Sequence, residues 1–317
     1  MTKHKFKKGD IVEILHPSEI AKTLDSNGTL DNLPFMAEMI PYCGKKFKVS
    51  ARLEKTCVEC KKPDSSVAEE MRAFLTDDVV ALENLRCSGS SHGGCQTGCV
   101  IFWKEAWLKK ADDKVNSPDG SEKDESQLQS KLKERDNTGR YFCQATQLAS
   151  STRVMSSKDK LVKLFNETLT GDISVMPAIK SVIKSPIRRI IPAASVKGLL
   201  TKTPAESLNL QAGEVVEVKP YDEILKTLDK QGRNKGLAFT YLMKEYCGKT
   251  FTVRNRLERM MNEATGEMKE IKNTVNLEGV VCKYENRFLG CPRQRFHIWR
   301  EIWLRRAEPN EQQDSSG

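Results

Sequence analysis

Short runs of alternating apolar and polar residues recur along the chain and predict β-strands with one buried face. The stretches "GDIVEIL" from Gly9 and "KKFKVSARLEKT" from Lys45 alternate in this way, and "VVALENLRC" and "VIFWKEAWLKKA" predict two further strands. The helical stretches are short: "SEIAKTLD" begins at a capping serine, and "PFMAEMIPYCG" ends at Gly44, a favourable C-cap. Short strands with small helical insertions predict a mainly β fold of the α+β class, built on small curled barrels.

The same pattern occurs twice. Residues 9–54 align without a gap with residues 213–258, at an offset of 204, and about half of the positions are identical. One fold used twice follows from this alignment. We therefore expect module 1 at 1–111, a flexible polar linker at 112–140, a basic helical connector at 141–205, module 2 at 206–310 and a disordered tail at 311–317.

The opening "GD-x-V-E-V" and the tryptophan-bearing last strand resemble SH3-like barrels. The paired "Y-C-G-K" segments, the "LRCSGSSHGGCQTGCVIFWKEAWLK" block and the "CPR…WREIWLRR" block are similar to those of an uncharacterised bacterial family. This resemblance covers nearly the whole chain. It implies two tandem SH3-like barrels joined by a helical segment, and it supplies no activity, because none is established for that family.

All four tryptophans fall at equivalent places in the two repeats: Trp103, Trp107, Trp299 and Trp303. Large aromatic side chains are mostly buried, so we expect them in the barrel cores. The alternative is that they line a binding groove at the barrel edge.

Three cysteines and a histidine lie close together in "RCSGSSHGGCQTGC". The pattern Cys87-x4-His92-x2-Cys95-x3-Cys99 has the ligand density of a metal knuckle, and its glycines allow the backbone to fold tightly around an ion. Cys57 opposes Met261 in the second repeat, and Cys99 opposes Arg295. These candidate ligands are therefore absent together from the second repeat, as expected for a set that works only when complete.

The predicted metal ligands are Cys57, Cys87, Cys95 and Cys99, with His92 as the alternate for one of them and Cys60 next. Zinc is the expected metal, and an iron–sulfur cluster is the second choice. The site is expected to be structural, because it offers four or more ligands and has no adjacent carboxylate to act as a general base. A reduced, partly buried cysteine group without metal is the alternative.

The cysteines outside this pattern carry weaker predictions. Cys43 and Cys247 end the same helical turn in both repeats, so we expect small buried apolar side chains there. Cys143 lies outside the repeats with no histidine near it in sequence, which favours an ordinary buried thiol over a nucleophile.

The net charge of +9 is concentrated in residues 141–205, which carry 10 basic and 3 acidic side chains. Within "PAIKSVIKSPIRRIIP", isoleucines form one stripe of a predicted amphipathic helix and the cations form another: Lys180, Lys184 and Arg188, with Arg189 beside them. The helix either packs between the modules, lies on an anionic membrane surface, or binds nucleic-acid phosphates or an acidic protein. Because the two modules carry almost no net charge, a nucleic-acid-binding protein is disfavoured.

No apolar run is long enough to span a bilayer, and the first residues lack the apolar stretch of a signal peptide. We therefore expect a cytoplasmic protein, with peripheral membrane attachment through the basic helix as an alternative. No P-loop, G-x-S-x-G or H-E-x-x-H motif is present, and no catalytic or organic-cofactor-binding residue is assigned.

These observations favour a non-catalytic binding or scaffold protein that presents barrel grooves to a protein partner. The second hypothesis is an accessory or biosynthetic enzyme that uses the cysteine cluster as a metal or cofactor centre. The third is a nucleic-acid-binding protein with tandem barrels.

Overall fold

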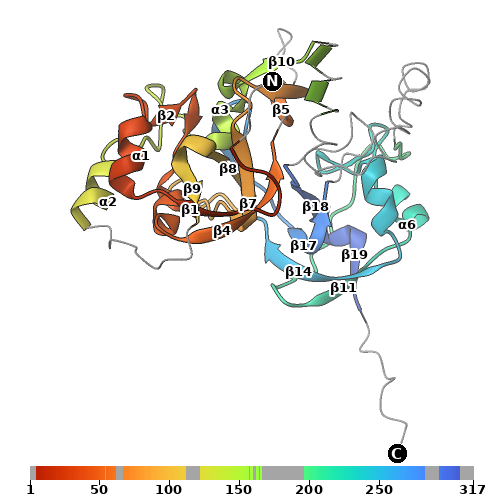
Figure 1. The fold of residues 1–317 in the computed structure, drawn as a ribbon. Helices are drawn as coiled ribbons and strands as arrows, with labels where there is room; N and C mark the ends of the chain where they lie inside the picture. The colour runs from red at the N-terminus through yellow and green to blue at the C-terminus, as the bar shows by residue number, and fades with distance from the viewer. Residues whose placement is uncertain are drawn as a thin grey trace, which may run out of the picture. The chain divides into compact units, whose positions relative to one another are not determined.

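The computed structural model describes residues 5–53, 55–61, 67–111, 122–156, 158–159, 162–163, 165, 196–282 and 293–307. These residues form two compact units (Figure 1). Unit 1 holds the described residues up to 165 together with 259–269 and 293–295, and unit 2 holds the remainder from 196 onward. Within the described part of the chain, no helix is both long enough and apolar enough to cross a membrane.

Unit 1 is built on a five-stranded antiparallel sheet with the strand order β8-β7-β4-β1-β9. Its strands are β1 (Ile11–Ile14), β4 (Lys46–Arg52), β7 (Val79–Arg86), β8 (Val100–Lys104) and β9 (Leu108–Lys110). The register shifts between Val49 and Ala51 in β4. Such an irregularity bends a strand and increases its twist, which helps to curl the sheet into a half-barrel.

Unit 2 repeats this arrangement with the order β18-β17-β14-β11-β19. Its strands are β11 (Val215–Val218), β14 (Thr250–Arg256), β17 (Thr274–Val281), β18 (Phe296–Arg300) and β19 (Leu304–Arg306). The register shift recurs between Val253 and Asn255, one repeat away from the shift in β4. The chain is therefore mostly β with a few helices, and the expected α+β class is confirmed at this level.

The remaining elements are short. Unit 1 adds α1 (Pro17–Thr23), β2 (Thr29–Leu30), β3 (Leu33–Pro34), η1 (Ala37–Tyr42), β5 (Lys55–Lys61), β6 (Val67–Phe74), η2 (Glu105–Trp107), α2 (Glu122–Gln129), α3 (Gln144–Ser151) and β10 (Thr152–Val154). The second repeat adds α6 (Tyr221–Leu225), β12 (Arg233–Asn234), β13 (Leu237–Ala238), η3 (Tyr241–Tyr246), β15 (Arg259–Asn262), β16 (Glu267–Glu270) and η4 (Glu301–Trp303).

The tryptophans lie at the centres of the two cores. All four side chains are 0% exposed. Trp107 meets the edge of Phe35 at 5.2 Å between ring centroids, and the equivalent Trp303 meets Phe239 at 5.3 Å. Their burial leaves no ring surface at Trp103, Trp107, Trp299 or Trp303 to line a groove, so the alternative role as groove aromatics does not fit the structure.

An arginine–glutamate pair with a buried glutamate fixes the segment before the first strand of each sheet. Glu105 pairs with Arg52 and accepts the backbone N–H of Phe6 at 3.2 Å. In unit 2, Glu301 pairs with Arg256 at 3.0 Å and accepts the backbone N–H groups of residues 208–210. The duplication thus extends to buried charges, which are stable in a core only when paired and hydrogen-bonded.

Part of the segment expected as a flexible linker is ordered. Helix α2 buries Leu128 completely and packs against α1, and Lys131 Nζ donates to the carbonyl of Ala21 at 2.7 Å. One apolar side chain and one lysine thus anchor a stretch whose average composition is that of a linker. The basic stripe Lys180, Lys184, Arg188 and Arg189 and the C-terminal residues 311–317 lie outside the described residues.

Unit 1 also contains segments of the second repeat. The backbone N–H of Gln96 donates to the carbonyl of Arg259 at 2.9 Å, and the N–H of Arg259 donates to Gln96 Oε1 at 3.0 Å. The N–H of Tyr141 donates to the carbonyl of Gly266 at 3.0 Å. Residues 259–269 and 293–295 therefore belong to unit 1, although the sequence placed them in module 2.

Candidate metal centre

A glycine-rich loop between β7 and β8 brings the candidate ligands together. Cys87 and Cys99 stand at the two ends of this loop, and the N–H of Cys87 donates to the carbonyl of Cys99 at 2.8 Å. Gly89 has φ +73°, and a Cβ atom there would lie 1.9 Å from the carbonyl oxygen of Cys95. Only glycine permits this approach, and the resulting turn carries His92 back over Cys87.

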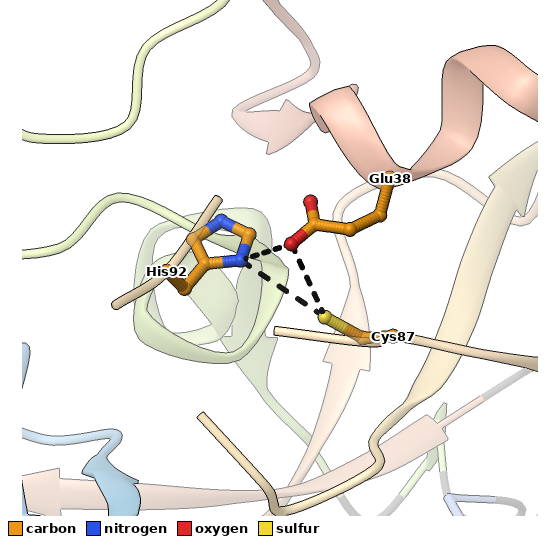
Figure 2. Close-up of side chains that lie close together, drawn as sticks. All are labelled: Glu38, Cys87 and His92. Atoms are coloured by element: carbon orange, nitrogen blue, oxygen red, sulfur yellow. Dashed lines mark hydrogen bonds and ion pairs between the residues drawn. The ribbon is translucent and has the colours of Figure 1, made fainter. Parts of the chain in front are cut away.

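Three ligand atoms, one from η1 and two from the loop, converge at this turn (Figure 2). His92 Nδ1 lies 2.9 Å from Glu38 Oε1, and Cys87 Sγ lies 4.0 Å from each of these two atoms. A tetrahedral zinc ion with bonds of about 2.0–2.3 Å would separate such atoms by roughly 3.3–3.6 Å. The observed separations bracket that range, so small side-chain rotations would seat an ion among Glu38, Cys87 and His92.

The carboxylate of Glu38 is held in place by the loop. The backbone N–H of Ser91 donates to Glu38 Oε1 at 3.0 Å, and its hydroxyl donates to Oε2 at 2.7 Å. Burial opposes ionisation of Glu38, but the hydrogen bonds from His92 and Ser91 outweigh it and lower its pKa to about 2. Glu38 is thus an ionised, oriented oxygen ligand at neutral pH.

The thiol of Cys87, unlike the carboxylate of Glu38, is held in its neutral form. Burial, followed by the nearby Glu38 and Cys99, raises its pKa well above the usual value for a cysteine. Without an ion the thiol is neutral. A metal binds thiolate, so binding at Cys87 would release a proton.

Beside this group lies a small cavity of about 30 Å³. It is lined by four thiols together with an imidazole and a guanidinium: Cys87, Cys95, Cys99, Cys143, His92 and Arg293. Burial also raises the pKa of Cys143, to about 12, and that of Cys99. The four cysteines of the cavity wall are thiols rather than disulfides.

The predicted ligands are therefore only partly assembled. Cys87, His92, Cys95 and Cys99 share the cavity, whereas Cys57 is buried in β5 and does not line it. Among the described residues, the group whose ligand atoms lie within 4.8 Å of one another is Glu38, Cys87 and His92. The four-cysteine ring expected from spacing is not closed in this structure. Cys60 lies in β5, and its side chain is outside the described part.

A buried ion pair forms one wall of the cavity. Arg293 is 1% exposed and binds the carboxylate of Glu263 with both Nη atoms, one of them at 2.7 Å, while Nη1 also donates to the carbonyl of Cys57 at 3.0 Å. The Nε–H of Arg293 has no hydrogen-bond partner among the described residues. A buried donor without an acceptor lowers the stability of the folded protein. We therefore expect this N–H group to donate to an acceptor in the cavity.

Sequence reasoning missed Glu38, Cys143, Glu263 and Arg293. Glu38 precedes Cys87 by 49 positions, too far for a spacing rule to connect them. A signal was nevertheless present, because the second repeat has Leu242 where the first has Glu38. The acid thus occurs only in the repeat that carries the cysteine cluster. Cys143 lies outside the repeats and has no counterpart in a second copy.

No protein family model matches the chain, and neither a curated protein nor a solved structure matches it.

Proposed function

We propose that this chain is a non-catalytic binding protein with two SH3-like barrels, and that unit 1 is stabilised by a structural zinc ion. The observation that carries the proposal is the convergence of Glu38, Cys87 and His92 in a buried position. An oxygen, a sulfur and a nitrogen ligand together suit zinc. An iron–sulfur cluster would require more thiolates than this group offers.

Enclosure of the site favours a structural role over a catalytic one. Glu38 is 8% exposed and His92 is 2% exposed. The adjoining cavity holds about 30 Å³, whereas small-molecule sites usually measure ~300–1,000 Å³. The small volume favours a fourth protein ligand over a bound substrate at such an ion.

The ion would fasten the glycine-rich loop to η1, since Glu38 lies on η1 and the other two ligands lie in the loop. An ion that binds only the folded protein stabilises it by about 2.7 kcal/mol when its concentration is 100 times Kd. That amount is a large fraction of the stability of an ordinary domain.

The binding role rests on the sequence. We place a protein partner on the barrel surfaces, and we assign the cations Lys180, Lys184, Arg188 and Arg189 to docking on an acidic partner or an anionic membrane surface, with nucleic acid as the alternative. A cytoplasmic location is part of this proposal, because the cytosol keeps thiols reduced and available to a metal.

Elemental analysis of the purified chain tests the metal proposal, with one zinc per chain as the expected result. Cys87→Ser should lose the zinc, because it removes the sulfur ligand of the converging group. Cys282→Ser is the matched control: it changes the counterpart of Cys87 in the second repeat and should leave the zinc content unchanged. A wild-type chain that binds no zinc after metal loading contradicts the proposal.

A further inference from the structure

The zinc site proposed above has three ligands from the converging group, and a structural zinc ion takes four. The fourth ligand must come from the wall of the adjoining cavity, where three further thiols lie. Strand pairing and the hydrogen-bond donor in the cavity wall select among these thiols.

Strand pairing favours Cys99. Arg86 is the partner of Val100 in the β7–β8 pair, so Cys87 and Cys99 come next to each other in the same antiparallel register. Side chains directly opposite in such a pair share a face, with Cβ atoms about 4.5–5.5 Å apart. A rotation about χ1 of Cys99 would therefore bring its sulfur to an ion bound at Cys87.

The charge count shows what a second thiolate at this centre would need beside it. Zinc carries +2, the Glu38 carboxylate and a Cys87 thiolate carry −1 each, and a metal-bound His92 is neutral. A second thiolate makes this buried centre −1, which requires a cation or a hydrogen-bond donor nearby. Arg293 supplies the donor, because it lines the same cavity as Cys99 and its buried Nε–H lacks an acceptor among the described residues.

We propose that Cys99 is the fourth zinc ligand and that Arg293, a residue of the second repeat, is a positioning residue whose Nε–H donates to the Cys99 thiolate. Glu263 completes the arrangement by holding the two Nη atoms, which fixes the direction of the Nε–H bond. This inference rests on the proposed zinc site. It explains why the second repeat contributes residues 293–295 to unit 1.

X-ray absorption at the zinc edge of the zinc-loaded full chain counts the sulfur ligands, since Zn–S bonds measure about 2.3 Å and Zn–N or Zn–O bonds about 2.0–2.2 Å. We expect two sulfurs in the wild type, one in Cys99→Ser and two in Cys143→Ser. A sulfur lost in Cys143→Ser instead would assign the fourth position to Cys143 and overturn the inference.

The sulfur count also separates the two proposals. A single sulfur, or more than two, in the wild type overturns Cys99 as the fourth ligand and leaves the zinc site in place. A chain that binds no zinc overturns the zinc site and the present inference together.

The role of Arg293 is tested by zinc affinity, measured by competition with a chromophoric chelator. Loss of an outer-shell partner commonly weakens metal binding about 10–100-fold, and we expect a loss of this size for Arg293→Gln. Arg293→Lys keeps the charge and should recover part of the affinity. Arg295→Gln is the control, because Arg295 also lies near Glu263, at 3.8 Å, but does not line the cavity.

A merely structural role would lower the thermal stability of the metal-free and zinc-loaded chains equally. The positioning role predicts a smaller gain in Tm on zinc loading in Arg293→Gln than in the wild type. Unchanged zinc affinity in Arg293→Gln overturns the assignment. Should that variant fail to fold, the same comparison in Arg293→Lys decides, and wild-type affinity together with a wild-type cobalt(II)–thiolate absorption band in that variant overturns it.

Discussion

At Gly89 the chain combines a left-handed backbone with a very close approach to another segment. Gly94, in the same loop, has the same φ of +73°, but a Cβ atom there would meet only Arg259 Nη1, at 3.7 Å. Alanine substitutions at these two positions therefore separate the free-energy cost of the backbone conformation from that of a steric clash.

Gly89→Ala should open the turn, because the added methyl group would overlap the carbonyl of Cys95. We expect a loss of more than about 1 kcal/mol in the free energy of unfolding, together with loss of zinc. Gly94→Ala should cost about 1 kcal/mol for the backbone alone and retain the ion. Urea unfolding and zinc analysis of the two variants check these predictions. Equal losses of stability and equal zinc contents would show that the close approach at Gly89 has no effect on the site.

Residue spacing predicted part of the site and could not predict the rest. Cys87 and His92 were found because they belong to one short loop whose glycines signal a tight turn. Glu38 and Arg293 reach the site only through the folding of the sheet, and no spacing rule connects them to the loop. The sequence also favoured Cys57 as a ligand, but that residue does not line the cavity, and its backbone carbonyl accepts a hydrogen bond from Arg293 Nη1.

At the scale of elements, the alternating strands of both sheets follow from their sequence pattern, because a period of two places every second side chain in the core. Composition predicts a flexible linker at 112–140, of which the structure describes residues 122–140. This stretch is polar on average, yet Leu128 is completely buried and orders α2 against α1. Averages over a segment cannot reveal an element that is anchored by one side chain.

Leu128→Ala therefore tests whether α2 is part of the folded unit. Removal of a buried leucine side chain usually costs about 2–5 kcal/mol, and the backbone amides of α2 should then exchange with solvent much faster. Lys123→Ala, at an exposed position of the same helix, is the control and should leave exchange unchanged. Fast exchange across α2 in the wild type would instead support the linker expected from composition.

For the whole molecule, the repeat comparison gave the architecture but not the boundaries of the units. Two sheets with the same strand order follow from the aligned repeats. Membership of residues 259–269 in unit 1 depends on contacts such as the Gln96–Arg259 backbone hydrogen bond. Such contacts between segments far apart in sequence leave no trace in composition or periodicity.

The duplication with one metal site predicts an asymmetric response to chelation. All proposed ligands and Arg293 belong to unit 1, so zinc should stabilise that unit and leave the sheet of unit 2 unaffected. Chelation should lower the temperature of one calorimetric transition by several degrees, since about 1 kcal/mol shifts Tm by roughly 2–4 °C for a unit of this size. The second transition should stay in place, and amide exchange should rise at Cys87 and His92 but not in β17 or β18. A uniform downward shift of both transitions would instead show that the ion stabilises the two units as one.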